Sequence, residues 1–199
     1  MTASRVGVFG GTFDPVHVGH LAIALAALET VPLDRVVFVP ARRSPLKERG
    51  PIADQEHRLA MLESATADEP RFSVSRIELD RGGPSYTVDT LEALAGEGRL
   101  FLILGADASA DLDRWKDPER VRALATLVVA RRSGAALPAG AIALDTPLMD
   151  ISARELRARA AQARSLRYLV PDPVCRYIEE HALYRRVPPG GSRATSPAS

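Results

Sequence analysis

Short runs of β-branched and aromatic residues alternate along this chain with longer segments rich in alanine and leucine. The runs lie at residues 6–9, 35–40, 100–104, 127–130 and 142–144. Runs of this kind are typical of buried strands, and the segments between them are long enough for helices. Strand, helix and strand in this order predict βαβ units, and therefore an α/β fold with a parallel sheet.

Helices are predicted at residues 21–29, 55–67, 88–95, 151–162 and 172–181. Asp54 is expected to cap the second of these, and Ser85 or Thr87 to cap the third, because short polar side chains bond to the first N–H groups of a helix. Residues 72–79 resemble a further strand. Their apolar alternation slips between Val74 and Ile77, which predicts a short or bulged strand there.

The chain has 199 residues, of which 46% are hydrophobic, enough for one α/β domain with a core of its own. We predict a single domain over residues 1–186. Residues 187–199 are rich in Gly, Ser and Pro, and we expect this tail to be disordered.

The charges nearly balance, with 26 basic and 25 acidic side chains and a net charge of +1. This balance argues against a general nucleic-acid-binding protein, which would carry a basic surplus. Cys175 is the single cysteine, so no intrachain disulfide is possible. Without a signal peptide or a run long enough to span a membrane, the sequence predicts a cytoplasmic protein. It leaves open whether the chain forms a homo-oligomer.

The stretch from residue 6 to residue 20 reads V-G-V-F-G-G-T-F-D-P-V-H-V-G-H and concentrates the candidate chemistry. Gly10 and Gly11 are expected to turn the backbone tightly after the first strand, and Asp14-Pro15 is typical of a turn. His17 and His20 are three residues apart and are expected to share one face of the next helix. The N-terminus of that helix would suit a phosphate.

Simpler interpretations exist for each of these features. A Gly-Gly pair after a strand can be a turn without a ligand, and the two histidines could be surface residues or half of a zinc site. One cysteine and four histidines argue against a structural zinc. The basic segment 41–53 could be a solvated loop, but its place after a strand end favours phosphate binding.

The complete stretch resembles the signature of the nucleotidyltransferase superfamily, G-x-F-x-P-x-H-x-G-H, which holds the triphosphate of a nucleotide. All its positions are present: Gly11, Phe13, Pro15, His17, Gly19 and His20. The resemblance implies a Rossmann-like, doubly wound parallel sheet with helices on both faces.

Later blocks resemble the bacterial nicotinate-nucleotide adenylyltransferases, so that the likeness covers residues 5–185. These blocks are S-Y-T-V-D-T-L at 85–91, Gly105-x-Asp107 with Leu112 and Trp115, residues 129–134, I-S-A-R-E-L-R at 151–157, and residues 170–178.

The resemblance implies transfer of the adenylyl group of ATP to nicotinate mononucleotide, which gives deamido-NAD and pyrophosphate in NAD biosynthesis. It implies Mg²⁺ carried with ATP rather than held by a metal site of the protein, and it makes His17 and His20 the catalytic residues. The implied ATP-binding residues are Gly10, Gly11, Thr12, Phe13, His17, His20, Gly105, Asp107, Arg131, Ile151, Ser152 and Arg157. The implied mononucleotide-binding residues are Lys47, Tyr86, Thr87 and Trp115.

Two departures from the family pattern concern details of binding. Ala153 and Arg154 stand where hydroxyl residues are usual, and Leu46 stands where a loop histidine is common. Alternative activities are adenylyl transfer to pantetheine phosphate or to nicotinamide mononucleotide, or a regulatory role without turnover. The alternatives at single positions are an N-cap role for Asp107 and a core position for Trp115.

Overall fold

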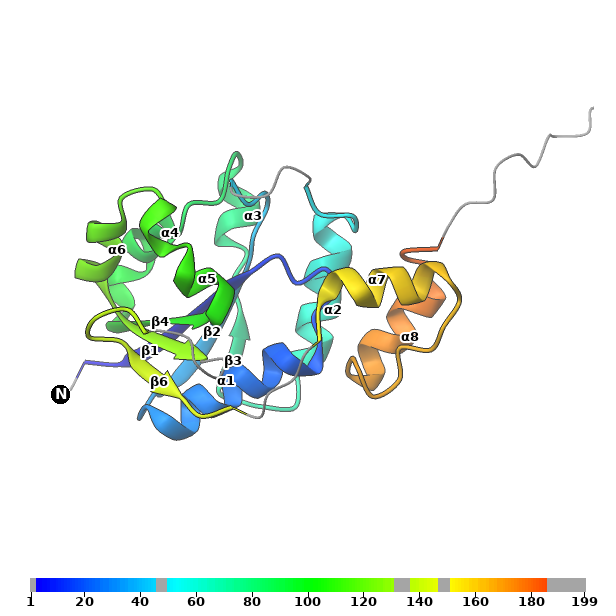
Figure 1. Cartoon of the computed structure of the whole chain (residues 1–199), viewed down its shortest axis with the longest axis horizontal. Helices are drawn as coiled ribbons and strands as arrows, with labels where there is room; N and C mark the ends of the chain where they lie inside the picture. Colours follow the sequence, from blue (N-terminus) through cyan, green and yellow to red (C-terminus); the bar gives the residue numbers. More distant parts are fainter. Residues whose placement is uncertain (1–2, 46–49, 131–136, 147–150, 186–199) are drawn as a thin grey trace, which may run out of the picture.

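A computed structural model describes residues 3–45, 50–130, 137–146 and 151–185 (Figure 1). These residues form one six-stranded sheet in the order β3-β2-β1-β4-β5-β6, and every neighbouring pair is parallel. The order is that of a doubly wound α/β fold, which confirms the expected fold class. The strands are β1 (Arg5–Gly11), β2 (Arg35–Pro40), β3 (Phe72–Val74), β4 (Arg99–Gly105), β5 (Ala125–Ala130) and β6 (Ile142–Leu144).

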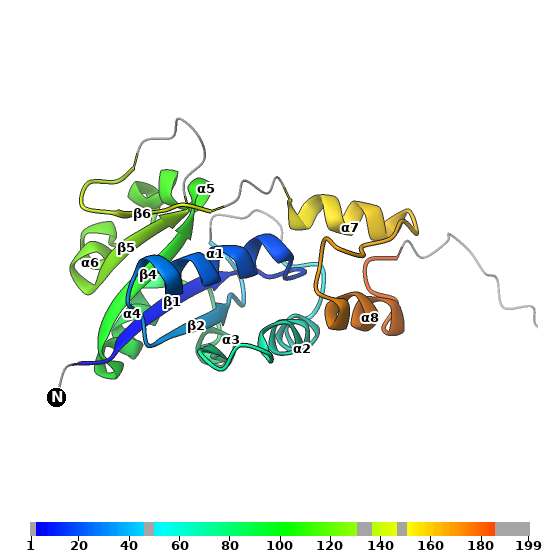
Figure 2. The same cartoon turned by 90° about the horizontal axis from the view of Figure 1, so that it is seen from below.

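Helices cover both faces of the sheet (Figures 1 and 2). One face packs against α1 (Val18–Thr30) and α2 (Gln55–Thr66), and the same apolar cluster continues beyond the strand ends to α7 (Ala153–Ala161) and α8 (Asp172–Glu180), of which α8 packs on α2 (Figure 2). The other face packs against α4 (Thr87–Leu94) and α6 (Pro118–Leu124). Shorter helical segments are α3 (Ile77–Arg81), α5 (Ala106–Ala110), and the 3₁₀ turns η1 (Ala95–Glu97) and η2 (Leu112–Arg114).

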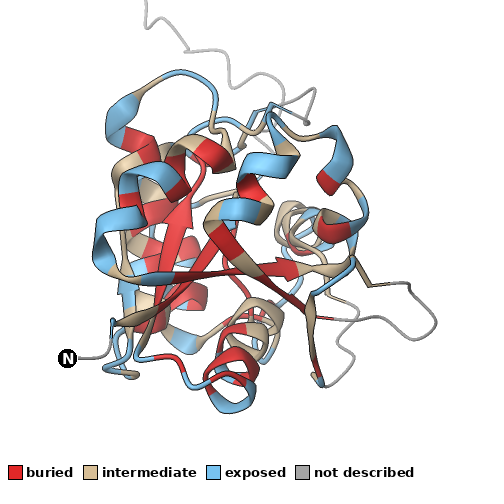
Figure 3. Ribbon diagram, turned by 90° about the vertical axis from the view of Figure 1, so that its left-hand side faces the viewer, coloured by how far each residue is buried: buried red, intermediate tan, exposed pale blue. Residues whose placement is uncertain are grey.

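The central strands are buried on both sides, as Figure 3 shows in red. In β4, Leu100, Leu102 and Leu104 enter the core beneath α4 and α6, whereas Phe101 and Ile103 enter the core beneath α1 and α2. Successive side chains of a strand point to opposite faces, so one continuous apolar run supplies two cores.

The strand order reverses at β1, which lies between β2 and β4. The chain goes from β1 outward to β2 and β3, then returns to β4 on the other side. In open α/β sheets a ligand crevice forms at this reversal, outside the carboxyl ends of the strands. The segments after Gly11 of β1 and Gly105 of β4 are therefore placed at one edge of the sheet.

The predicted strand at residues 72–79 is half right. Residues 72–74 form β3, but residues 77–81 form α3. The guanidinium of Arg76 lies 3.4 Å from the carboxylate of Asp80, a four-residue spacing that a helical turn brings into contact.

The two predicted helix caps have different outcomes. Asp54 is the N-cap residue of α2, as predicted, but its side chain makes no capping hydrogen bond to the described residues. Tyr86, rather than Ser85 or Thr87, is the N-cap residue of α4. The hydroxyl of Ser85 accepts instead from the main-chain N–H of Arg42, because the loop after β2 runs beside it. Among the described residues, no helix has both the length and the apolar character needed to cross a membrane.

Candidate active site

The backbone turn after β1 lies further along the chain than the sequence predicted. Gly10 and Gly11 still belong to the strand, and the turn begins at Phe13, whose φ is 47°, followed by a cis peptide bond between Asp14 and Pro15. Gly11 is needed for packing, since a Cβ there would lie 2.8 Å from the ring of Phe13. The prediction that the two glycines form the turn is therefore wrong.

His17 and His20 lie together at the start of α1, as predicted. Their rings stack with centroids 3.7 Å apart and an interplanar angle of 29°. The main-chain N–H of His17 donates to Nδ1 of His20 at 3.2 Å. Because this nitrogen accepts, the neutral ring of His20 carries its proton on Nε2, where it is a hydrogen-bond donor.

The ring of His17 is buried and uncharged at neutral pH. Burial lowers its pKa from 6.5 to about 4, because the interior disfavours the charged form. Among the described residues its Nδ1 has no hydrogen-bond partner. A Cβ at Gly19 would lie 3.1 Å from that nitrogen, so the glycine of the H-x-G-H motif leaves room for the ring.

Asp14 connects the signature loop to two other parts of the chain. The residue is 2% exposed, and its carboxylate accepts from the main-chain N–H groups of Ile52 at 2.7 Å and Ala53 at 3.2 Å. It also accepts from the hydroxyl of Tyr184 at 2.7 Å. The turn chemistry read from Asp14-Pro15 contained no sign of this role.

Arg58 of α2 is buried completely beneath the loop. Its Nη1 donates to the carbonyl oxygens of Thr12 at 2.8 Å and Ala41 at 2.7 Å, and so ties the segments after β1 and β2 together. Burial lowers the pKa of the guanidinium, and the charge of Asp14 opposes this. A sequence signal existed: Arg58 precedes Met61 and Leu62 by three and four residues, which places it on the apolar face of the helix.

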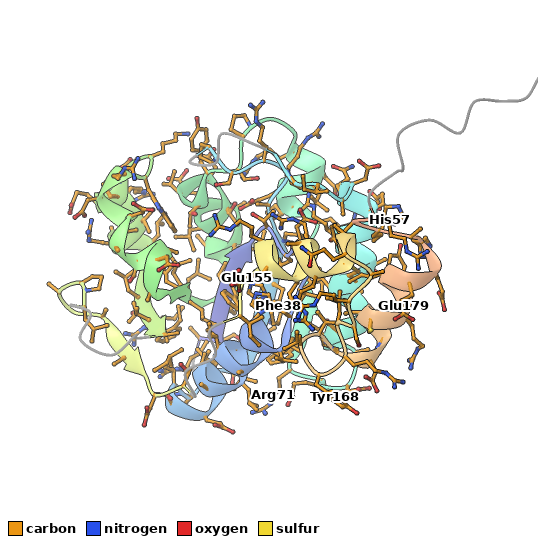
Figure 4. The ribbon with its side chains drawn as sticks, turned by 45° about the vertical axis from the view of Figure 1, so that its right-hand side comes forward. Phe38, His57, Arg71, Glu155, Tyr168 and Glu179 are labelled. Carbon is orange, nitrogen blue, oxygen red and sulfur yellow. The ribbon has the colours of Figure 1, made fainter. Side chains whose placement is uncertain are left out.

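Helix α7 brings two predicted phosphate ligands toward the same loop. Ser152 is its N-cap, and the Ser152 hydroxyl accepts from the N–H of Glu155 at 3.2 Å. Arg157, one turn further on, donates from Nη1 to the carbonyl oxygen of Asp14 at 2.6 Å. Figure 4 shows α7, with Glu155 labelled, on the same side of the molecule as α2 and α8.

Three of the four predicted mononucleotide residues lie on the other face of the sheet. Tyr86 and Trp115 pack against the same core, and Thr87 is the first residue of α4. The ammonium group of Lys116 lies 2.8 Å from the carboxylate of Asp89 and 4.7 Å from the ring centroid of Tyr86, which links the two segments. Trp115 is half-buried, and its Nε1 has no partner among the described residues.

The remaining predicted site residues lie in other segments or outside the described residues. Gly105 ends β4 and is the N-cap of α5, with Asp107 exposed in the first turn, so Gly105 rather than Asp107 occupies the cap position. Ile151 is half-buried beside Ser152. Lys47 and Arg131 lie outside the described residues, so their roles stay predictions.

Known proteins of similar sequence identify the family of this chain. Residues 8–159 match the cytidylyltransferase-like family. The chain is 49% identical to a protein of Roseiflexus sp. (strain RS-1) named probable nicotinate-nucleotide adenylyltransferase, over 93% of this chain and 100% of the relative. A protein of the same name from Thermus thermophilus is 50% identical, over 91% and 100%. This chain belongs to the nicotinate-nucleotide adenylyltransferase family.

The family membership confirms the resemblance found in the sequence motifs. A solved structure of Plasmodium falciparum nicotinic acid mononucleotide adenylyltransferase, described as complexed with NaAD, has a TM-score of 0.74 to this chain at 16% identity. It covers 91% of this chain and 97% of its own. At this identity the likeness concerns the fold, and it is consistent with the doubly wound sheet of the nicotinate-nucleotide adenylyltransferases.

Proposed function

We propose that this chain transfers the adenylyl group of ATP to nicotinate mononucleotide, giving deamido-NAD and pyrophosphate in NAD biosynthesis. The observation that carries the proposal is the stacked pair of His17 and His20 at the strand-order reversal of the sheet. The names of the relatives support the choice of reaction.

The reaction requires alignment more than acid–base chemistry. The attacking group is the phosphate of the mononucleotide, already an anion at neutral pH, so no strong base or covalent intermediate is required. The attack forms a P–O bond at the α-phosphorus of ATP, and pyrophosphate leaves with the electron pair of the broken bond. Catalysis then consists of holding the two phosphates in line and stabilising the charge that develops between them.

His20 is suited to the charge-stabilising part of this task. Its Nδ1 accepts from the main chain, so its Nε2–H is a donor of fixed orientation at the start of α1. The positive end of the α1 dipole favours an anion at the same place. The neutral ring of His17 stacks against His20 and supports its orientation.

Other parts of the site bind the ends of the two substrates. We assign the β- and γ-phosphates to Ser152 and Arg157 at the start of α7, and the phosphate chain to the main chain of residues 10–13. We assign the adenosine to Gly105, Asp107, Arg131 and Ile151. The pyridine ring and its carboxylate belong to Tyr86, Thr87 and Trp115, with Lys47 on the mononucleotide phosphate.

We propose that Mg²⁺ reaches the site bound to the phosphates of ATP. Among the described residues, no group of three or more His, Cys, Asp or Glu side chains is arranged to hold a metal ion. Mg²⁺ prefers phosphate oxygens and water in such sites, where it neutralises phosphate charge. The protein itself orients those phosphates through His20, Ser152 and Arg157.

The remaining parts of the proposal rest on composition. We propose a cytoplasmic protein, since its single cysteine suits a reducing compartment. The net charge of +1 argues against nucleic acid as a partner.

The test is a competition between two mononucleotides. The purified chain is incubated with ATP, Mg²⁺ and equal amounts of nicotinate and nicotinamide mononucleotide, and the dinucleotides are separated by chromatography. The N–H groups at the start of α4 favour a carboxylate over a carboxamide by charge-assisted hydrogen bonds. We expect a preference for the acid of at least ~10-fold, and as much as ~10³-fold, in kcat/KM.

Two outcomes would contradict the proposal. Equal use of both mononucleotides would make the chain a dual-specificity enzyme. Absence of pyrophosphate release with either one would remove the proposed reaction altogether.

A further inference from the structure

The C-terminal end of the described chain reaches the signature loop. Tyr184 follows α8, with a φ of 63°, and its hydroxyl donates to Oδ1 of Asp14 at 2.7 Å. The two residues are 170 positions apart. Burial raises the pKa of the Tyr184 phenol, and the charge of Asp14 adds to the effect, so the hydroxyl keeps its proton and remains a donor.

The carboxylate of Asp14 accepts three hydrogen bonds from the described residues. Oδ1 accepts from Tyr184 at 2.7 Å and from the N–H of Ala53 at 3.2 Å. Oδ2 accepts from the N–H of Ile52 at 2.7 Å. All three donors are neutral groups.

Arg157 lies beside this carboxylate without a hydrogen bond to it. Its Nη1 is 3.7 Å from Oδ2 of Asp14, beyond hydrogen-bond distance, and bonds instead to the carbonyl oxygen of the same residue at 2.6 Å. A guanidinium has five N–H donors, and the side chain of Arg157 is 26% exposed. The guanidinium is therefore held near the loop by the carbonyl bond, and it forms a long ion pair with the carboxylate without a hydrogen bond to it.

We propose that Tyr184 is a positioning residue for the triphosphate of ATP, because its hydroxyl occupies the carboxylate of Asp14 and so keeps Arg157 available to phosphate. The inference rests on the proposed function, in which Arg157 binds the β- and γ-phosphates. Without the hydroxyl, Oδ1 loses its shortest donor. The nearby guanidinium then closes onto the carboxylate as a charge-assisted pair, which competes with the phosphates for the same N–H groups.

A purely structural role for Tyr184 predicts a different result. The hydroxyl would then only anchor the C-terminal segment, and its removal would lower stability without a specific effect on ATP. The affinity for ATP, measured separately from stability, therefore distinguishes the two roles.

The experiment compares two removals of a tyrosine hydroxyl from the C-terminal part of the full chain. Tyr184→Phe removes the bond to Asp14, whereas Tyr177→Phe removes a 3.0 Å contact between its hydroxyl and Nδ1 of His57, away from the signature loop. Each ring is kept, so the packing of the ring is unchanged. ATP is titrated calorimetrically with Mg²⁺ and without mononucleotide, and the melting temperature is measured in parallel.

We expect Tyr184→Phe to weaken ATP binding by about five- to tenfold, the size expected for one hydrogen bond and the competition it releases. Tyr177→Phe should bind ATP as the wild type does. In an Arg157→Ala background the effect of Tyr184→Phe should disappear, because the competing group is gone.

Three results would overturn the inference: unchanged ATP affinity in Tyr184→Phe, an equal loss in Tyr177→Phe, or a loss that persists in the Arg157→Ala background. Failure of the wild type to bind ATP would overturn the proposed function as well. ATP binding without use of nicotinate mononucleotide would overturn only the assigned second substrate.

Discussion

The imidazole rings of His17 and His20 stack face to face, 3.7 Å between centroids, and the main-chain N–H of His17 binds Nδ1 of His20. The two histidines are therefore unequal. His17 is buried and neutral, and its ring and backbone fix the ring of His20. His20 is half-buried and presents Nε2–H as the donor of the pair.

Replacement of His20 by alanine should lower kcat by ~10²–10³, the usual cost of removing one preorganised donor from a site where charge develops. ATP affinity should change much less, because this donor acts chiefly in the transition state. Single-turnover kinetics and an ATP titration measure the two effects. His57→Ala is the control, since His57 lies on α2 toward α8 and outside the proposed site (Figure 4). A kcat within tenfold of wild type would contradict the role of His20.

The stability of the protein should depend on pH through His17. Its pKa is about 4 in the folded chain against 6.5 for an unperturbed histidine, so the unfolded chain binds more protons between these values. The free energy of unfolding should then fall as pH drops from 6.5 to 4, by about 3 kcal/mol from this residue. Above about pH 7.5 the contribution should be constant.

Denaturant unfolding of wild type and His17→Gln at a series of pH values isolates this contribution. Carboxylates titrate alike in both proteins, so the difference between the two curves belongs to His17. If the free energies of unfolding of the two proteins changed in parallel between pH 4 and 6.5, the ring would not be buried as described.

Replacement of Arg58 by methionine should destabilise the protein strongly. The change leaves the carbonyl oxygens of Thr12 and Ala41 without their shared donor, and each such loss costs about 1–3 kcal/mol. We expect a loss of at least about 2 kcal/mol in urea unfolding. Arg76→Met is the matched control, because Arg76, which precedes α3, forms an exposed ion pair with Glu56 of α2, and its loss should cost under about 1 kcal/mol.

Trp115 should contribute to binding of the mononucleotide but not to the choice between acid and amide. Stacking on an indole ring is nearly indifferent to the replacement of a carboxylate by a carboxamide. Trp115→Ala should therefore raise KM for both mononucleotides and keep their ratio of kcat/KM. Competition assays on the variant measure the ratio, with Trp115→Phe as the control that retains an aromatic ring. A changed ratio would assign part of the selectivity to Trp115.

Local patterns in the sequence were enough to predict most of the strands, the parallel sheet and the family. The run at residues 100–104 is apolar at every position, as a strand buried on two faces must be. The spacing of His17 and His20 predicts a shared helix face, and the rings stack there. The motifs are contiguous, so the resemblance could be read without a structure.

The residues that support the signature loop could be identified only in the folded chain. Asp14, Arg58 and Tyr184 come from three distant parts of the chain, and no local pattern records that their polar groups meet. The predicted cap of α4 was wrong for the same reason, since the hydroxyl of Ser85 accepts instead from a tertiary partner, the N–H of Arg42. Burial sets the protonation of His17, and burial is a property of the folded chain: the same imidazole in an unfolded chain titrates near its ordinary pKa.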